Sequence, residues 1–376
     1  MNIGAQKLPG RFGSAFFMIK KNAMPSEVFW KNKKVFITGH TGFKGGWLSV
    51  WLSKLGANVT GYSLKPNTTP SFYDACMVGS VCNSIFGNIL DYEQLKKSIL
   101  ETKPDIIIHM AAKALVLESY KFPLETYQTN LMGTVNILDI IRNCSSVKAF
   151  INVTSDKCYE NVNKNYSYKE TDPMGGYDPY SSSKGCSELI TSAYRSSFFE
   201  KKQTSVASAR SGNVIGGGDW SSDRLIPDFF KAISKNDSFY IRQPNSTRPW
   251  QHVFEPLRGY LILSENLFKN KGFSEAWNFG PIHNDPITVK QVLTELKLKW
   301  NKPVEIIYEN EDEQLHEANF LSLDITKSSS KLGWKPLLGI EDTIAMTCDW
   351  YRQFYEGKNN MFQYSLDQIN TYESLI

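Results

Sequence analysis

Short apolar runs rich in β-branched and aromatic residues alternate along the chain with stretches of helical period. The runs occupy residues 33–38, 59–64, 105–110, 148–154 and 205–209. Between them, apolar residues recur every three or four positions over 44–55, 92–101, 123–143 and 180–199. Strands that alternate with helices in this way form βαβ units, whose parallel sheet is covered on both faces. The pattern predicts an α/β fold, a doubly wound parallel sheet of the Rossmann type.

The alternation stops after Arg210, where the glycine-rich segment 216–218 leads into shorter, mixed elements. A second stretch of α+β character runs from about residue 285 to 356. We therefore expect a smaller C-terminal α+β domain that binds a substrate and completes a cleft beside the parallel sheet.

Composition and net charge limit the kinds of molecule that the protein is expected to bind. The chain is 41% apolar and 21% charged, which is ordinary for a globular protein. Its net charge is +4, and four cations without any acid lie within residues 1–23. The rest of the chain is formally neutral, which argues against nucleic acid or an anionic membrane as the main partner.

The cysteines and histidines exclude two further classes. The six cysteines include no Cys-x-x-Cys pair, which favours a reduced, cytoplasmic protein over a disulfide framework. The five histidines have no ligand spacing, so we expect no zinc site. No apolar run approaches the ~20 residues that a helix needs to cross a bilayer.

A glycine-rich turn follows the first predicted strand, with glycines at 39, 42 and 45. Glycine lets the backbone turn tightly and approach a pyrophosphate, whose charge the helix N-terminus stabilises. With a strand before it and a helix after it, the spacing indicates a dinucleotide site. The second strand lacks the usual acidic residue at its end, and Lys65 there also suits a 2′-phosphate, so these residues leave NAD and NADP open.

A phenol and an ammonium stand four residues apart at Tyr180 and Lys184, on one face of a predicted helix. We expect the lysine charge to lower the pKa of the phenol, so that a phenolate takes a proton from a sugar hydroxyl. A predicted strand ends at Thr154-Ser155, where a hydroxyl is placed to share the hydrogen bond of the phenol. This set resembles the site of the short-chain dehydrogenases/reductases.

Asp156 and Lys157 follow Ser155 at the carboxyl end of that strand, where ligands bind in open α/β sheets. A reductase or epimerase needs only the serine, the tyrosine and the lysine. An additional proton donor and acceptor favour elimination of water from an oxidised sugar, and a surface ion pair is the alternative.

Six motifs carry a closer resemblance, which covers the chain from about residue 29 to about residue 350. They are TGHTGFKGGWL (38–48), TSDKCY (154–159), PMGGYDPYSSSKG (173–185), SGNVIGGGDW (211–220), DRLIPD (223–228) and RPWQHV (248–253). The chain is similar in these motifs to the CDP-glucose 4,6-dehydratase family, extended short-chain dehydrogenases/reductases of nucleotide-sugar metabolism.

The resemblance implies a lyase that dehydrates CDP-D-glucose to CDP-4-dehydro-6-deoxy-D-glucose on bound NAD. Tyr180 would take the C4 hydroxyl proton while the C4 hydride passes to the cofactor. Asp156, with a raised pKa, would protonate the departing C6 hydroxyl, and Lys157 would remove the C5 proton. The hydride then returns to C6.

The resemblance also implies the residues of each site. The catalytic residues would be Ser155, Asp156, Lys157, Tyr180 and Lys184. The cofactor would contact Gly39, Thr41, Gly42, Phe43, Lys44, Gly45, Asn88, Ile89, Ala111, Ala112, Asn130, Tyr180 and Lys184. The substrate would contact Lys113, Asn213, Gly218, Asp219, Arg242, Arg248 and Asn278. For Asn88, the residues alone favour a plain turn almost equally.

The chain departs from the family over residues 111–120, where Lys113 replaces a glutamine and Leu117 an arginine. We expect Lys113 to supply the phosphate charge that the missing arginine would give. The alternatives are an NAD-dependent UDP-hexose 4-epimerase, which leaves Asp156 and Lys157 without a role, and a catalytically silent dinucleotide-binding regulator.

On this interpretation the chain divides into four parts. A disordered extension or misassigned start covers 1–28, and an NAD-binding Rossmann domain covers 29–210. A mainly nucleotide-sugar-binding domain covers 211–356, with some segments returning to the Rossmann domain, and a tail covers 357–376. We expect a homo-oligomer, either a dimer or a tetramer.

Overall fold

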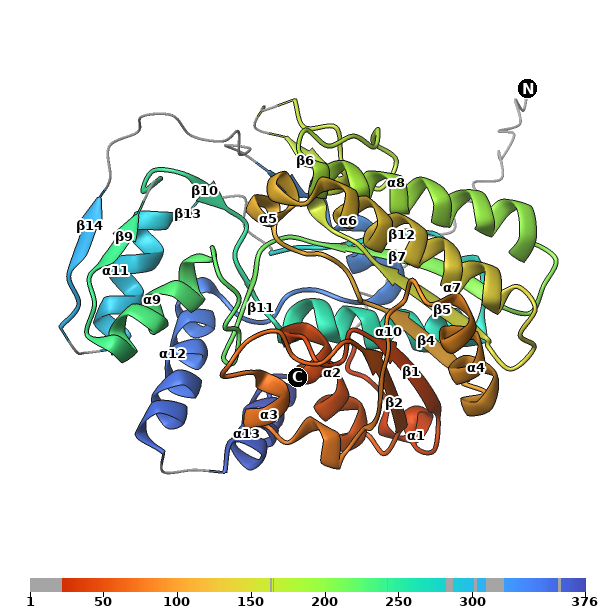
Figure 1. Ribbon diagram of the computed structural model, residues 1–376, viewed down its shortest axis with the longest axis horizontal. Helices are drawn as coiled ribbons and strands as arrows, with labels where there is room; N and C mark the ends of the chain where they lie inside the picture. The colour runs from red at the N-terminus through yellow and green to blue at the C-terminus, as the bar shows by residue number, and fades with distance from the viewer. Residues whose placement is uncertain are drawn as a thin grey trace, which may run out of the picture.

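The computed structural model describes residues 22–162, 164, 166–241, 243–281, 287–300, 303–308, 321–357 and 360–376. Within these residues, seven parallel strands form the central sheet in the order β12-β7-β5-β4-β1-β2-β3 (Figure 1). The strands are β1 (Lys34–Thr38), β2 (Asn58–Ser63), β3 (Asn83–Phe86), β4 (Ile106–His109), β5 (Ala149–Val153), β7 (Ser205–Ser211) and β12 (Ala276–Phe279). The predicted Rossmann-type parallel sheet is confirmed.

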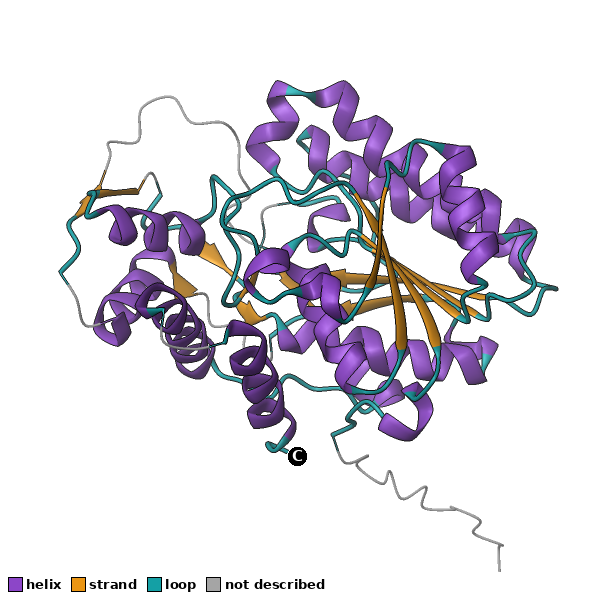
Figure 2. Cartoon of the chain, turned by 60° about the horizontal axis from the view of Figure 1, so that its bottom comes forward, coloured by secondary structure: helices purple, strands orange, loops and turns teal. Residues whose placement is uncertain are grey.

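Helices cover both faces of the sheet (Figure 2). Val35 and Ile37 of β1 pack into one hydrophobic cluster with α2 and α10, whereas Phe36 packs into a second cluster with α4 and α7. This alternation follows from the two-residue period of a strand, and it explains why the strands read as continuous apolar runs. The helices are α2 (Phe43–Lys54), α4 (Tyr92–Thr102), α7 (Gly133–Ile141), α8 (Pro179–Tyr194) and α10 (Phe254–Lys269).

The strand order reverses at β1, which pairs with β2 on one side and with β4 on the other. In open α/β sheets, ligands bind at such a switch point, in the crevice at the carboxyl ends of the strands. The glycine-rich turn after β1 and the Ser155–Lys157 segment after β5 both lie at this edge, because parallel strands end on the same side.

A second group of elements lies to the left of the sheet in Figure 1. It comprises α9 (Leu225–Lys235), β9 (Phe239–Ile241), α11 (Val289–Trp300), β14 (Ile306–Tyr308) and α12 (Ile340–Glu356). Short pairs join it to the rest: β8 (Val214–Ile215) with β11 (Gln251–His252), β10 (Thr247–Arg248) with β13 (Ile287–Thr288), and β6 (Ser167–Tyr168) with β15 (Ser322–Leu323). Because β12 and α10 belong to the later sequence yet pack in and on the main sheet, the division at residue 210 stays a prediction.

The two ends of the described chain differ from expectation. Residues 1–21 lie outside the described residues, but Ala23 and Ser26 already bond to Gly333 and Glu265, and α1 (Glu27–Trp30) follows. The expected C-terminal tail instead contains α13 (Met361–Glu373), whose apolar face is buried and whose Glu373 accepts a hydrogen bond from Trp51 of α2 at 2.8 Å. The helical spacing of Met361, Ser365, Ile369 and Tyr372 explains this helix, and the boundary of the tail stays a prediction.

All six cysteines carry free thiols. Of the helices in the described parts of the chain, none combines the length and the apolar character needed to span a membrane.

Candidate active site

The turn between β1 and α2 is built so that only glycine fits. Gly39 has a φ of +83°, and a Cβ on it would lie 2.9 Å from the backbone nitrogen of Ala111. A Cβ on Gly45 would lie 2.1 Å from the Gly39 carbonyl oxygen, and Gly42 caps α2. The backbone therefore approaches closely at a helix N-terminus, and this cradle fits the pyrophosphate of a dinucleotide.

Other residues predicted to contact the cofactor surround the same edge, with their polar atoms partly engaged. Thr41 bonds to the Leu64 carbonyl, and the Asn88 side chain accepts from the Leu90 amide at 3.0 Å, as a turn residue does. Asn130 is buried and binds both the amide and the carbonyl of Lys113. Ile89 is buried, and Ala111 and Ala112 follow β4 directly. Their contacts with a cofactor stay predictions.

Tyr180 and Lys184 lie one turn apart at the start of α8, which Asp178 caps by accepting from the Ser181 amide. Burial raises the pKa of Tyr180 to about 12, against opposing effects of the Ser155 hydroxyl and the Arg224 guanidinium. Burial lowers the pKa of Lys184 to about 8, and its ammonium donates to the Val153 carbonyl at 3.3 Å. Desolvation thus dominates the pKa of the phenol in this structure, and the predicted lowering of that pKa by the Lys184 charge stays a prediction.

Ser155 organises the segment that follows β5. Its hydroxyl donates to Asp156 Oδ1 at 3.0 Å and accepts from the Lys157 amide at 3.2 Å, which starts a short 3₁₀ turn over Asp156–Cys158. Asp156 is 2% exposed, and its other oxygen, Oδ2, is buried with no hydrogen-bond partner among the described residues. Burial raises the pKa of Asp156, as protonation of a leaving hydroxyl requires, although the Lys157 charge opposes this shift.

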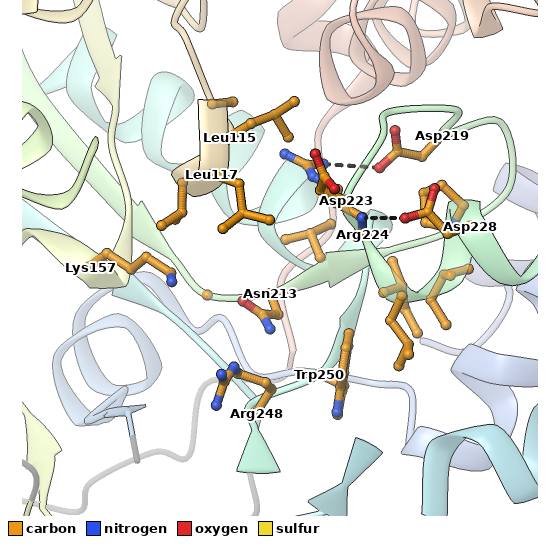
Figure 3. Close-up of a pocket in the computed structure, with 18 of the residues that line it drawn as sticks. Leu115, Leu117, Lys157, Asn213, Asp219, Asp223, Arg224, Asp228, Arg248 and Trp250 are labelled. Atoms are coloured by element: carbon orange, nitrogen blue, oxygen red, sulfur yellow. Dashed lines mark hydrogen bonds and ion pairs between the residues drawn. The ribbon is translucent and has the colours of Figure 1, made fainter. Parts of the chain in front are cut away.

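These groups share one cavity of about 660 Å³ between the sheet edge and the second group of elements. Asp156, Lys157 and Tyr180 line it, together with Asn213, Asp219 and Arg248, which were predicted to contact the substrate. Figure 3 shows Lys157, Asn213 and Arg248 on one side of the cavity and Asp219 and Arg224 on the other.

Three residues predicted to bind substrate do not line this cavity. Lys113 pairs with Glu118 at 2.8 Å and with Glu125 at 3.3 Å, so its charge is already balanced. Asn278 is fully buried and bonds to the Tyr159 hydroxyl at 2.7 Å. Gly218 is required for the backbone conformation of its turn, since its φ is +85° and a Cβ would lie 2.4 Å from Phe72. Their contacts with substrate stay predictions, and Arg242 lies outside the described residues.

Sequence reasoning missed Arg224, which lies on the cavity wall. Its guanidinium donates to Asp219 at 2.9 Å, and its charge acts on both Tyr180 and Lys44. The DRLIPD motif contained the signal, since it places an arginine before a helix, but motif position alone gives no direction for the side chain. Trp250 was also missed, and its buried Nε1 at the cavity has no partner among the described residues.

Lys44 was predicted to contact only the cofactor, yet its ammonium lies at the catalytic cavity. It donates to Ser211 at 3.2 Å and lies near Asp156, Lys184 and Arg224. Burial, followed by the charges of Lys184 and Arg224, lowers the pKa of Lys44 to about 7.

The parallel sheet, the glycine cradle and the serine, tyrosine and lysine beside it are together those of an extended short-chain dehydrogenase/reductase. The family model described as GDP-mannose 4,6 dehydratase matches residues 36–347. The chain is 45% identical over 363 residues to the CDP-glucose 4,6-dehydratase of Salmonella typhimurium, with 95% of this chain and 99% of that protein covered. The chain therefore belongs to the GDP-mannose 4,6 dehydratase family of nucleotide-sugar enzymes.

Solved structures share the fold at lower sequence identity. The UDP-glucose 4-epimerase of Thermotoga maritima, solved with UDP-glucose, is 22% identical with a TM-score of 0.74, over 85% of this chain and 99% of that one. The dTDP-glucose 4,6-dehydratase of Bacillus anthracis, solved with NAD, is 19% identical with a TM-score of 0.70, over 89% of this chain and 99% of that one.

Proposed function

We propose that this protein is a hydro-lyase that converts CDP-D-glucose to CDP-4-dehydro-6-deoxy-D-glucose with NAD as its cofactor. One observation carries the proposal: Asp156 is buried beside Lys157 in the cavity of Tyr180, and one of its carboxyl oxygens has no partner in the part of the chain that the structure describes. A 4-epimerase has no use for such an acid, whereas loss of water requires a proton donor to the departing hydroxyl.

The first step is oxidation at C4. Tyr180 removes the proton of the C4 hydroxyl, and Arg224 and the Ser155 hydroxyl favour the phenolate that does so. Bound in the glycine cradle, NAD would supply the hydride acceptor at C4 and the hydride donor at C6. We propose that Lys184 holds the nicotinamide ribose, and its four-residue spacing from Tyr180 supports this role.

The second step is elimination across C5 and C6. The C4 ketone acidifies the C5–H bond, and Lys157 removes that proton. Asp156 donates a proton to the C6 hydroxyl, which leaves as water. Lys157 then returns its proton to C5 when hydride reaches C6, so the sugar loses one water and gains no net reduction.

Arg248, Asn213 and Asp219 are the residues that we propose for substrate binding. Arg248 is the cation suited to the pyrophosphate, because a guanidinium forms bidentate, charge-assisted bonds with phosphate oxygens. The 45% identity to a CDP-glucose 4,6-dehydratase over nearly the whole chain supports cytidine as the base.

The test is incubation of the NAD-loaded protein with CDP-glucose, UDP-glucose and dTDP-glucose in parallel. A 4-keto-6-deoxy product absorbs near-ultraviolet light in base. We expect this absorbance with CDP-glucose at a higher kcat/KM than with the other two. Unchanged CDP-glucose together with epimerised UDP-glucose would overturn the proposal.

We also propose a homo-oligomer in the cytoplasm. Leu124 and Leu189, on α6 (Pro123–Tyr127) and α8, are 69% and 59% exposed, which supports self-association through these helices. The free thiols support a reducing compartment. Size-exclusion chromatography with light scattering tests the proposed homo-oligomer, and a single monomeric species would contradict it.

A further inference from the structure

The proposed dehydration leaves Tyr180 with one proton more and Asp156 with one proton fewer than at the start. The inference that follows concerns these protons, and it rests on the proposed function. In each turnover Tyr180 gains the proton of the C4 hydroxyl, which the ketone product never takes back. Asp156 loses a proton to the departing water. Lys157 takes a proton from C5 and returns it, so it ends unchanged. A second turnover therefore requires that one proton move from the phenol to the carboxylate.

The structure places a single hydroxyl between these two groups. The Ser155 hydroxyl donates to Asp156 Oδ1 at 3.0 Å, and its hydrogen-bonding effect on the Tyr180 phenol lowers the pKa of that phenol. Ser155, Asp156 and Tyr180 line the same cavity. All three side chains are buried, with exposed fractions of 9% for Tyr180, 6% for Ser155 and 2% for Asp156. Bulk solvent thus has poor access to both ends of the chain of hydrogen bonds.

We propose that the Ser155 hydroxyl is a proton relay that resets the enzyme by carrying one proton from Tyr180 to Asp156 after each turnover. The phenol gives its proton to Ser155 Oγ, while Ser155 gives its own to Asp156 Oδ1. The O–H bonds of Tyr180 and Ser155 break as new ones form on Ser155 and Asp156, so atoms and charge balance without an external acid or base.

This relay explains how Tyr180 and Asp156 reach the protonation states that the reaction needs at the same time. Tyr180 must be a phenolate and Asp156 a carboxylic acid, yet burial raises the pKa of both. Moving one proton between them leaves the total charge of the cavity unchanged, which avoids the cost of burying an additional anion. The phenolate form is then a minor population that oxidation of the substrate consumes.

The two carboxyl oxygens of Asp156 have different roles in the proposed relay. Oδ1 faces Ser155, whereas the unpartnered Oδ2 is left for the sugar hydroxyl. Gly212 leaves space beside Oδ2, since a Cβ there would lie 2.8 Å from it. Rotation of the carboxyl group then presents the acquired proton to the sugar.

The experiment compares two rates in Ser155→Ala and in the matched variant Ser155→Thr, which keeps the hydroxyl. The first is steady-state formation of ketosugar. The second is first-turnover C4 oxidation, followed by the absorbance of reduced nicotinamide in a Lys157→Ala background, where elimination stalls. Thermal melting with NAD verifies folding, and Ser155→Gly removes the same hydroxyl if Ser155→Ala does not fold.

A relay predicts that loss of the hydroxyl slows steady-state turnover about tenfold or more beyond its effect on first-turnover oxidation. Imidazole buffer then speeds the variant in proportion to its concentration, because protons must travel through solvent, and it leaves wild type and Ser155→Thr unchanged. Equal losses in both rates, or no effect of buffer, would overturn the relay.

Failure of the proposed function is seen separately, in wild type. If wild type dehydrates UDP-glucose or dTDP-glucose instead, CDP-glucose is not the substrate. The relay is then tested with the sugar nucleotide that reacts, because the relay depends on the hydroxyl groups of the sugar and not on the nucleotide base. If wild type dehydrates none of the three, the dehydration and the relay fall together.

Discussion

The Glu188 carboxylate accepts a hydrogen bond from Arg210 at 2.8 Å, with both side chains only 4% exposed. Thr154 and Ser208 donate to the same carboxylate at 2.5 and 2.6 Å. Glu188 thereby ties the end of β5, where Ser155 begins, to α8, where Lys184 lies one turn away. The buried Glu188 carboxylate, with its three hydrogen bonds, therefore fixes the position of β5 relative to α8 at the catalytic edge of the sheet.

Glu188→Gln should lower the free energy of unfolding by about 3–5 kcal/mol, because it leaves the Arg210 guanidinium buried without its counter-charge. Denaturant unfolding measures this. The control is Glu101→Gln, which breaks an exposed pair with Lys97 at 3.9 Å and should change stability by about 1 kcal/mol or less. Equal effects of the two substitutions would contradict a structural role for Glu188.

Lys44→Met should stabilise the protein in the absence of nucleotide, by an amount that depends on pH. Burial lowers the pKa of Lys44 from 10.5 to about 7, so between these values the unfolded chain binds the extra proton and stability rises with pH. The cost of the buried ammonium is complete below pH 7 and shrinks toward pH 10.5. The gain from Lys44→Met should therefore be on the order of a few kcal/mol at pH 6 and smaller at pH 9.

Melting temperatures at the two pH values test this, with Lys97→Met on an exposed position as the control. The same gain at both values would show that the Lys44 ammonium is not the source of the cost.

Tyr180→Phe and Lys157→Ala should stop the reaction at different stages. Without the phenol, no base takes the C4 hydroxyl proton, so no reduced nicotinamide appears. Without the Lys157 amine, oxidation proceeds but elimination slows by about 10²–10⁴, and reduced nicotinamide accumulates on the enzyme. Stopped-flow absorbance distinguishes the two, and normal turnover of Lys157→Ala would mean that another group removes the C5 proton.

Gly218→Ala should destabilise the fold rather than weaken substrate binding. Its positive φ and the 2.4 Å approach to Phe72 together cost about 1–3 kcal/mol in a variant with a Cβ. Gly339→Ala is the matched control, because no atom of the described residues lies within 4 Å of a Cβ there. A raised KM for CDP-glucose without a loss of stability would instead support the predicted contact of Gly218 with substrate.

Local patterns explain which parts of the fold the sequence predicts. The strand, glycine turn and helix over residues 34–54 are encoded within one short segment, and so is the Ser155–Lys157 sequence at a strand end. The helix expected over 123–143 is interrupted by a π-helical turn, Gln128–Met132, which apolar spacing does not reveal. The packed helix α13 was missed because its partner, Trp51, lies more than three hundred residues earlier.

A related limit applies to the predicted site residues. Lys113 was expected to meet phosphate, but Glu118 and Glu125 take its charge. Asn278 was expected to meet substrate, but Tyr159 and the Tyr168 carbonyl engage its amide. A motif gives a residue type and a place on an element, whereas the partner of its side chain depends on residues outside the motif.

The most direct test uses CDP-glucose that carries deuterium at C4. Intramolecular oxidation, elimination and hydride return predict a product lighter by one water, with the deuterium at C6 by NMR. A product of unchanged mass with the deuterium still at C4 would contradict dehydration through Tyr180, Asp156 and Lys157.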